Sequence, residues 1–365
     1  MNIIRKSLQF GLSLALCAGF VTTAPAQATA DAATQKLPNV TILATGGTIA
    51  GTGATSTTTV GYTAAKVGVD ALIAAVPELK KVANVRGEQV MQIASENMNN
   101  DAWLKLAKRV NTLLAQSDVD GIVITHGTDT IEETAYFLDL VVKSKKPVVI
   151  VGAMRPSTAI SADGPINLYN AVLLAGSKEA VGKGVLVTLN DQINAGREVT
   201  KTNTSTMDTF KTPELGFLGY IQGSKPYFYR QSTRKNTADT PFDIMNLDKL
   251  PQVDIVYGYA NMNPIALNAF VAAGAQGIIH AGVGDGSLNN TVVPSLTEAR
   301  KKGVVIVRSS RVGQGIVARN GEADDDKLDF VVSDTLNPQK ARILLMLALT
   351  KTTDSKEIQK MFWEY

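Results

Sequence analysis

The 365-residue sequence has one cysteine, Cys17, and only two histidines, His126 and His280. A single thiol excludes an intramolecular disulfide and a thiolate cluster that could hold a metal. Both histidines adjoin apolar, strand-like runs, where a packed and hydrogen-bonded ring is common, so a serine–histidine–aspartate triad is poorly supported. The chemistry of this chain is therefore expected to use hydroxyl groups and amines.

Basic and phosphate-binding features are also scarce. The 36 Lys and Arg side chains are balanced by 33 Asp and Glu without a basic cluster, which gives no support for nucleic-acid binding. The sequence has no P-loop, and the glycine-rich turn at residues 282–287 departs from the dinucleotide fingerprint, which disfavours a cytosolic nucleotide-binding enzyme. No histidine or carboxylate set has metal-ligand spacing, so we expect no metal site.

Residues 1–28 have the pattern of a secretory signal peptide. A basic start precedes an apolar run over residues 8–21, which is too short for a typical transmembrane helix, and small residues lead to an expected cleavage after Ala28. Cleavage would remove Cys17 and lower the formal net charge of +3 by two. The alternative is an uncleaved anchor.

Apolar runs alternate with helical periods along the rest of the chain. Short runs rich in Val and Ile are typical of parallel strands buried on both faces. We predict strands over residues 40–44, 121–125, 147–151, 185–189, 253–257, 277–280 and 304–308. Helix-start signals are Asp101, a capping box of Thr130 and Glu133, Asp163 before Pro165, and Asn337 before Pro338.

This alternation predicts an α/β protein with two doubly wound, mostly parallel-sheet domains. A polar stretch near residues 230–241 interrupts the pattern, which resumes at Val253. We predict a larger N-terminal α/β domain over 37–229, a linker over 230–251 and a smaller C-terminal α/β domain over 252–365.

Two polar turns follow predicted strands: TGGT at residues 45–48 and HGTDT at residues 126–130. Open α/β folds bind ligands at the carboxyl ends of their strands, so we expect Thr48 and Thr128 to face one pocket. The segment 51–61, rich in Gly and Thr, is either a loop that closes over a ligand or a plain surface loop.

A threonine hydroxyl needs a base to become a nucleophile, and Lys201 is the candidate after histidine. Its amine would need burial or a second cation to lower a pKa of about 10.4. A Thr128–Lys201 pair oriented by Asp129 fits the logic of a catalytic triad, although the sequence alone does not bring these residues together. Asp129 also precedes a predicted helix, whose N-terminus could bind a substrate carboxylate; the alternative is that Asp129 only caps the helix, and the two roles are compatible.

The turns and three further segments resemble the bacterial type II asparaginases, in particular the glutaminase-asparaginase subgroup. The matching segments are residues 45–50, 125–130, 152–156, 161–164 and 337–342, and the resemblance extends over residues 37–365. It implies hydrolysis of L-glutamine and L-asparagine to the acids and ammonia, no cofactor, a homotetramer of intimate dimers and, with the leader, a periplasmic location. The rival interpretation is a periplasmic amino-acid-binding protein without turnover.

The resemblance also implies residue roles. These are Thr48 as nucleophile, Tyr62 as its activator, Glu322 as the supporting carboxylate, a second triad of Thr128, Asp129 and Lys201, and Ser95 and Glu96 on the substrate's α-carboxylate and α-ammonium groups. The neighbouring subunit would supply Ser287 and Glu322 to the site. An alternative makes Thr128 responsible for attack or for activating water.

Two positions suggest dual specificity. Glu96 and Ser287 stand where many asparagine-preferring relatives have Gln and Asn. A smaller side chain at 287 relaxes the site for a substrate one methylene longer, a difference of only about 1–3 kcal/mol. Asp285 stands where relatives commonly have Asn, and its negative charge has no assigned role.

Overall fold

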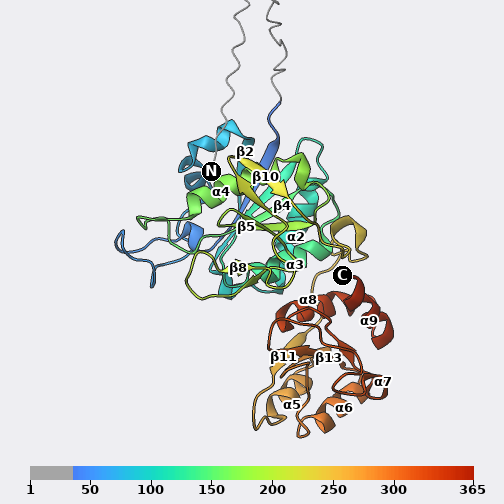
Figure 1. Ribbon diagram of the computed structural model, residues 1–365. Helices are drawn as coiled ribbons and strands as arrows, with labels where there is room; N and C mark the ends of the chain where they lie inside the picture. The colour runs from blue at the N-terminus through green and yellow to red at the C-terminus, as the bar shows by residue number, and fades with distance from the viewer. Residues whose placement is uncertain (1–35) are drawn as a thin grey trace, which may run out of the picture. The chain divides into compact units, whose positions relative to one another are not determined.

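The computed structural model describes residues 36–365, so the predicted signal peptide lies outside the described residues. Residues 37–365 form one compact unit that contains two large sheets. Figure 1 draws the first sheet in blue to yellow and the second in orange to red. None of the helices in residues 36–365 is long and apolar enough to span a membrane.

The first sheet has eight strands in the order β10-β9-β6-β5-β4-β3-β1-β2. Its parallel part consists of β1 (Asn39–Gly46), β2 (Asn84–Ile93), β3 (Gly121–Thr125), β4 (Val148–Val151) and β5 (Val185–Leu189). Antiparallel strands extend it: β6 (Gln192–Ala195), β9 (Gly219–Gln222) and β10 (Lys225–Phe228). Since β2 and β3 lie on opposite sides of β1, the strand order reverses between β1 and β3, which is where doubly wound folds bind ligands.

The second sheet is parallel and has the order β11-β12-β13-β14. Its strands are β11 (Val253–Tyr257), β12 (Gly277–Gly282), β13 (Val305–Ser310) and β14 (Val331–Val332). A separate two-stranded ribbon pairs β7 (Thr200–Lys201) with β8 (Phe210–Lys211).

Helices and single 3₁₀ turns connect the strands. The helices are α1 (Val69–Ala74), α2 (Asn100–Leu114), α3 (Ile131–Val141), α4 (Gly164–Ala175), α5 (Ile265–Ala272), α6 (Val293–Lys301), α7 (Asp325–Leu328), α8 (Pro338–Ala348) and α9 (Ser355–Glu364). The 3₁₀ turns are η1 (Thr48–Ala50), η2 (Pro77–Lys81), η3 (Ser95–Asn97), η4 (Lys178–Ala180) and η5 (Thr237–Asp239).

Alternate side chains of the first sheet enter two different cores. Leu43 and Ile124 pack with α2 and α3, whereas Ile42 and Val123 pack with α1 and α4. The core beneath α2 and α3 continues into α8 and α9, which cover one face of the second sheet, and α5 and α6 cover the other. The predicted α/β class and its two helix-covered sheets are thus confirmed, while the boundaries at 37–229, 230–251 and 252–365 stay a prediction.

All seven predicted strands are present, with ends that differ by no more than a few residues. The prediction missed β2, an edge strand with mostly exposed or half-buried side chains and no apolar run. It also missed β6, although Asn190 and Asp191 form a two-residue turn with φ values of 52° and 60° that is typical of hairpins.

Two helix starts behave differently. Asn337 caps α8 as predicted, because its side chain accepts a hydrogen bond from Lys340 N. The capping box at Thr130 and Glu133 is wrong: Thr130 precedes α3 but caps no backbone N–H, since its hydroxyl donates to Ser95 O at 2.8 Å instead.

Candidate active site

The turns after β1 and β3 pack backbone against backbone. Gly46 and Gly47 have φ values of 115° and 82°, and a Cβ atom on Gly47 would lie 2.3 Å from Gly127 N. No side chain fits there, so only glycine allows this approach. Each of these touching glycines is followed directly by a threonine, Thr48 in one turn and Thr128 in the other.

Thr48 begins η1 and is 6% exposed. Its Oγ1 lies 2.7 Å from Tyr62 Oη, and either hydroxyl can donate. Tyr62 follows the segment 51–61, whose first residues are tied down by hydrogen bonds from Ser157 to Gly51 O and from Gly53 N to Thr158 Oγ1 at 2.8 Å. The loop therefore positions the phenol of Tyr62 against the hydroxyl group of Thr48.

A second hydroxyl group lies beside an ammonium and a carboxylate. Lys201 Nζ donates to Thr128 Oγ1 at 3.0 Å and to Asp129 Oδ1 at 2.7 Å. Lys201 comes from the β7–β8 ribbon, and Thr128 is 5% exposed. The predicted Thr128–Asp129–Lys201 group is thus assembled by contacts between segments more than 70 residues apart.

Ser95 joins this group from η3. Its Oγ accepts a hydrogen bond from Asp129 N at 3.2 Å. Ser95 also packs against Gly127, since a Cβ atom added to Gly127 would lie 2.5 Å from Ser95 Oγ. Glu96 is exposed beside it. Because Thr130 also donates to Ser95 O, the turn after β3 and η3 are held together.

His126 is a buried support for the same turn. Its Nδ1 lies 2.7 Å from Gly127 O and its Nε2 lies 2.9 Å from Thr134 Oγ1, which also accepts from Trp103 Nε1. Burial lowers the pKa of His126 to about 4, so the ring is neutral near pH 7. The prediction that His126 is packed and hydrogen-bonded is confirmed, whereas its contact with Gly127 O is not apparent from the sequence.

Ser287 and Glu322 belong to loops of the second sheet. Ser287 is half-buried in the turn after β12, and Glu322 is exposed. Within residues 36–365 no hydrogen bond or ion pair connects either side chain to Thr48, Tyr62 or Thr128 of the same chain. The hydrogen bonds described within one chain therefore do not connect these two predicted residues to the threonine turns.

A buried ion pair supports both loops. Arg308 and Asp325 are fully buried and bond through two nitrogens at 2.6 and 2.8 Å, and Arg308 also donates to Asp285 O and Gly286 O at 3.1 Å. The Asp285 carboxylate accepts from Ala318 N at 2.7 Å. Asp285 thus has a structural partner: it connects the turn that carries Ser287 to the loop that leads to Glu322.

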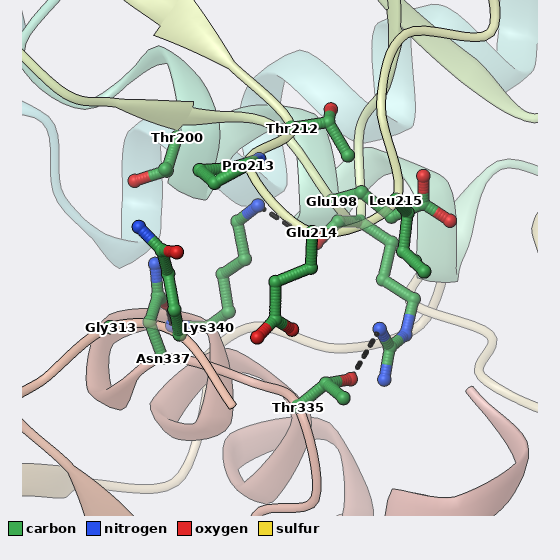
Figure 2. A pocket seen from close by; sticks show the side chains of 12 residues that line it. Glu198, Thr200, Thr212, Pro213, Glu214, Leu215, Gly313, Thr335, Asn337 and Lys340 are labelled. Carbon is green, nitrogen blue, oxygen red and sulfur yellow. Dashed lines mark hydrogen bonds between the residues drawn. The ribbon is translucent and has the colours of Figure 1, made fainter. Parts of the chain in front are cut away.

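A separate small pocket of about 50 Å³, partly open to solvent, lies beside β7 (Figure 2). Its walls come from Arg197, Glu198, Thr200, residues 212–215 and 313–314, and Thr335, Asn337 and Lys340. Neither Thr48 nor Thr128 lines it. Among residues 36–365, no cluster of three or more His, Cys, Asp or Glu side chains is arranged to hold a metal ion.

Comparisons with known proteins identify the fold and its relatives. The family described as "Asparaginase, N-terminal" matches residues 39–234, and "Glutaminase/Asparaginase C-terminal domain" matches residues 252–362. The chain is 59% identical over 331 residues to a glutaminase-asparaginase of Pseudomonas fluorescens biotype A, covering 90% of this chain and 91% of that protein. It is 54% identical over 329 residues to a "Probable L-asparaginase periplasmic" of Haemophilus influenzae, covering 90% and 93%.

A solved structure agrees with these matches. The crystal structure of a "Probable Cytoplasmic L-asparaginase" from Campylobacter jejuni superposes with a TM-score of 0.87 at 51% identity. The match covers 90% of this chain and 100% of that one.

Proposed function

Since this chain belongs to the asparaginase family and is an amidohydrolase of L-glutamine and L-asparagine, we propose that its reaction passes through a covalent acyl-enzyme on Thr48. The observation that carries the proposal is the 2.7 Å contact between Thr48 Oγ1 and Tyr62 Oη. This distance suits direct transfer of the threonine proton to the phenol oxygen.

In the first step Thr48 Oγ1 attacks the side-chain amide carbon, while Tyr62 takes the hydroxyl proton and passes it to the leaving nitrogen. The carbon–nitrogen bond breaks and ammonia departs, which leaves an ester on Thr48. Backbone N–H groups near Thr128 hold the oxyanion, a role worth about 10²–10³ in rate.

In the second step water cleaves the ester and restores the Thr48 hydroxyl. The contacts of Lys201 with Thr128 and Asp129 support a role for this group in activating that water or assisting the first attack. The alternative assigns the first attack to Thr128, which has a lysine nitrogen at 3.0 Å.

Substrate recognition combines two subunits in this proposal. Ser95 and Glu96 hold the α-carboxylate and α-ammonium groups, and Ser287 and Glu322 reach the site from a neighbouring copy in a homotetramer. The absence of a hydrogen bond from Ser287 or Glu322 to Thr48 within the described residues of one chain is consistent with this arrangement. An isolated subunit would then be inactive.

The proposed location is the periplasm, and the support is the signal-peptide pattern of residues 1–28. The names of relatives differ on this point, since the Haemophilus protein is called periplasmic and the Campylobacter protein cytoplasmic. Fractionation of cells that express the full chain tests it: the protein is expected in the periplasmic fraction, shortened at its N-terminus.

Ammonia release from L-glutamine and L-asparagine by the purified protein tests the function. We expect turnover of both amides, because Glu96 and Ser287 match the dual-specificity pattern and discrimination by one methylene is small. Binding of either amino acid without ammonia release would favour the rival, a periplasmic amino-acid-binding protein.

A further inference from the structure

The first turn of α8 contacts both segments that bring together Thr128, Asp129 and Lys201. Lys340 is 2% exposed, and its Nζ donates to Gly196 O at 3.3 Å, to Arg197 O at 2.8 Å and to Val199 O. Val199 immediately precedes β7, which carries Lys201. The Lys340 ammonium therefore donates hydrogen bonds to three backbone carbonyls of the segment that leads to Lys201. Figure 2 shows Lys340 extending from α8 to this backbone.

The same turn of α8 also contacts the start of α3. Asn337 Nδ2 donates to Glu132 Oε2 at 3.1 Å, and Gln339 Nε2 donates to Glu132 Oε1 at 3.3 Å. Glu132 is 6% exposed and stands three residues after Asp129. Asn337 Oδ1 also accepts a hydrogen bond from Lys340 N, so the two contacts belong to one hydrogen-bonded helix turn.

These contacts indicate a role for Lys340 and Asn337, which are not among the proposed catalytic residues. We propose that Lys340 and Asn337 are positioning residues that fix Lys201 relative to Thr128 and Asp129 by bracing β7 and the start of α3 against one helix turn. The proposal rests on the proposed function, since it explains how the Thr128–Asp129–Lys201 group acquires its geometry. A displacement of about 1 Å at a reacting group can cost about 10²-fold in rate.

Because Lys340 is buried, the contacts that brace β7 depend on the charge of its ammonium group. Burial lowers the pKa of Lys340 to about 8. The carboxylates of Glu132, Glu198 and Asp139 raise this pKa, and the Arg197 guanidinium lowers it. Removal of the ammonium would leave three backbone carbonyls without this donor, and unpaired buried acceptors are costly. The brace is thus expected to loosen when the nitrogen is removed, even though the helix remains.

Hydrogen–deuterium exchange and steady-state kinetics on the full chain test the proposal together. In Lys340→Met we expect the peptide over residues 196–202 to exchange at least about tenfold faster, because charged hydrogen bonds are lost. We expect kcat for both amides to fall by about 10²-fold while KM stays within about threefold, since the substrate-binding residues are not touched. Lys351→Met is the matched control: this exposed lysine follows α8, and both readouts should stay unchanged.

Substitutions at the Asn337–Glu132 contact distinguish a positioning role from general destabilisation. They also test the proposal if Lys340→Met does not fold. Asn337→Asp keeps an acceptor for Lys340 N but places a second carboxylate against Glu132, so exchange over residues 128–134 should accelerate and kcat should fall. Adding Glu132→Gln restores one amide and one carboxylate, and should recover most of both readouts.

Unchanged exchange over 196–202 and 128–134 would overturn the brace, as would faster exchange with an unaltered kcat, or no recovery in the double variant. Absence of ammonia release by the unsubstituted protein would instead refute the proposed function. The exchange data would then decide alone whether α8 holds these two segments.

Discussion

Gly47 and Gly127 touch so closely that a Cβ atom on Gly47 would lie 2.3 Å from the Gly127 backbone nitrogen. This contact brings together the ends of β1 and β3, at the point where the strand order of the first sheet reverses. It also places the two threonine-bearing turns from separate strands next to each other. The proposed site therefore depends on this glycine contact as well as on the two hydroxyl groups.

Gly47→Ala tests this contact. Alanine at the backbone angles of Gly47 (φ 82°, ψ −170°), a region essentially restricted to glycine, costs about 1–3 kcal/mol, and the clash with Gly127 adds about 1–3 kcal/mol of overpacking. Gly182→Ala is the control, since Gly182 has a φ of 72° and nothing within 4 Å of its Cβ position. Urea unfolding should show the larger loss for Gly47→Ala, accompanied by lost ammonia release; equal losses would argue against the contact.

Lys201→Met tests the second triad. It removes the nitrogen that lies 3.0 Å from Thr128 Oγ1 and 2.7 Å from Asp129 Oδ1, and we expect kcat to fall by about 10²–10⁴, the range typical of proton-transfer groups. Lys211→Met on the neighbouring strand β8 is the control and should keep kcat within about twofold. Similar rates for both variants would remove Lys201 from the mechanism.

Ser287→Asn tests the proposed determinant of substrate length. We expect kcat/KM to move toward L-asparagine relative to L-glutamine by about 10-fold or more, in line with discrimination by one methylene. Asp285→Asn is the matched control, because its amide oxygen can still accept from Ala318 N and hold the same turn. An unchanged preference in Ser287→Asn would mean that position 287 does not set specificity.

Asp139 makes stability depend on pH. Burial raises its pKa to about 7, while its Oδ1 accepts from Val185 N at 2.7 Å. Between its unfolded pKa near 3.9 and about 7 the folded state binds more protons than the unfolded state, so this group lowers the free energy of unfolding as pH rises through that window. Asp139→Asn keeps the acceptor without the charge, and should be more stable than the parent by a few kcal/mol at pH 8.

The stabilisation by Asp139→Asn should shrink toward zero near pH 4, as followed by urea unfolding across the pH range. His126 and His280 act in the opposite direction, because burial lowers both pKa values to about 4 and stability from them falls as pH drops below about 6.5. They are present in both proteins, so their effect cancels in the difference. A difference that does not vary with pH would contradict a buried, proton-binding Asp139.

The sequence predicts much of this fold because the buried parallel strands are continuous apolar runs, such as residues 121–125 and 185–189. It also places Thr48 and Thr128 at the strand ends. It cannot show that Lys201 reaches Thr128, because that contact depends on a ribbon 73 residues away. The exposed edge strand β2 and the brace by Lys340 escape prediction for the same reason: tertiary contacts, and no local pattern, define them.

The central claim is that Thr48 forms the acyl-enzyme, and it is tested by identifying the side chain that carries the acyl group. Rapid acid quench of the enzyme with L-glutamine, followed by digestion and mass spectrometry, should find a γ-glutamyl ester on the peptide that contains Thr48. The ester should persist in Thr128→Val and vanish in Thr48→Ala, whose turnover should fall by at least about 10³-fold. An ester on Thr128, or near-normal turnover by Thr48→Ala, would contradict the account.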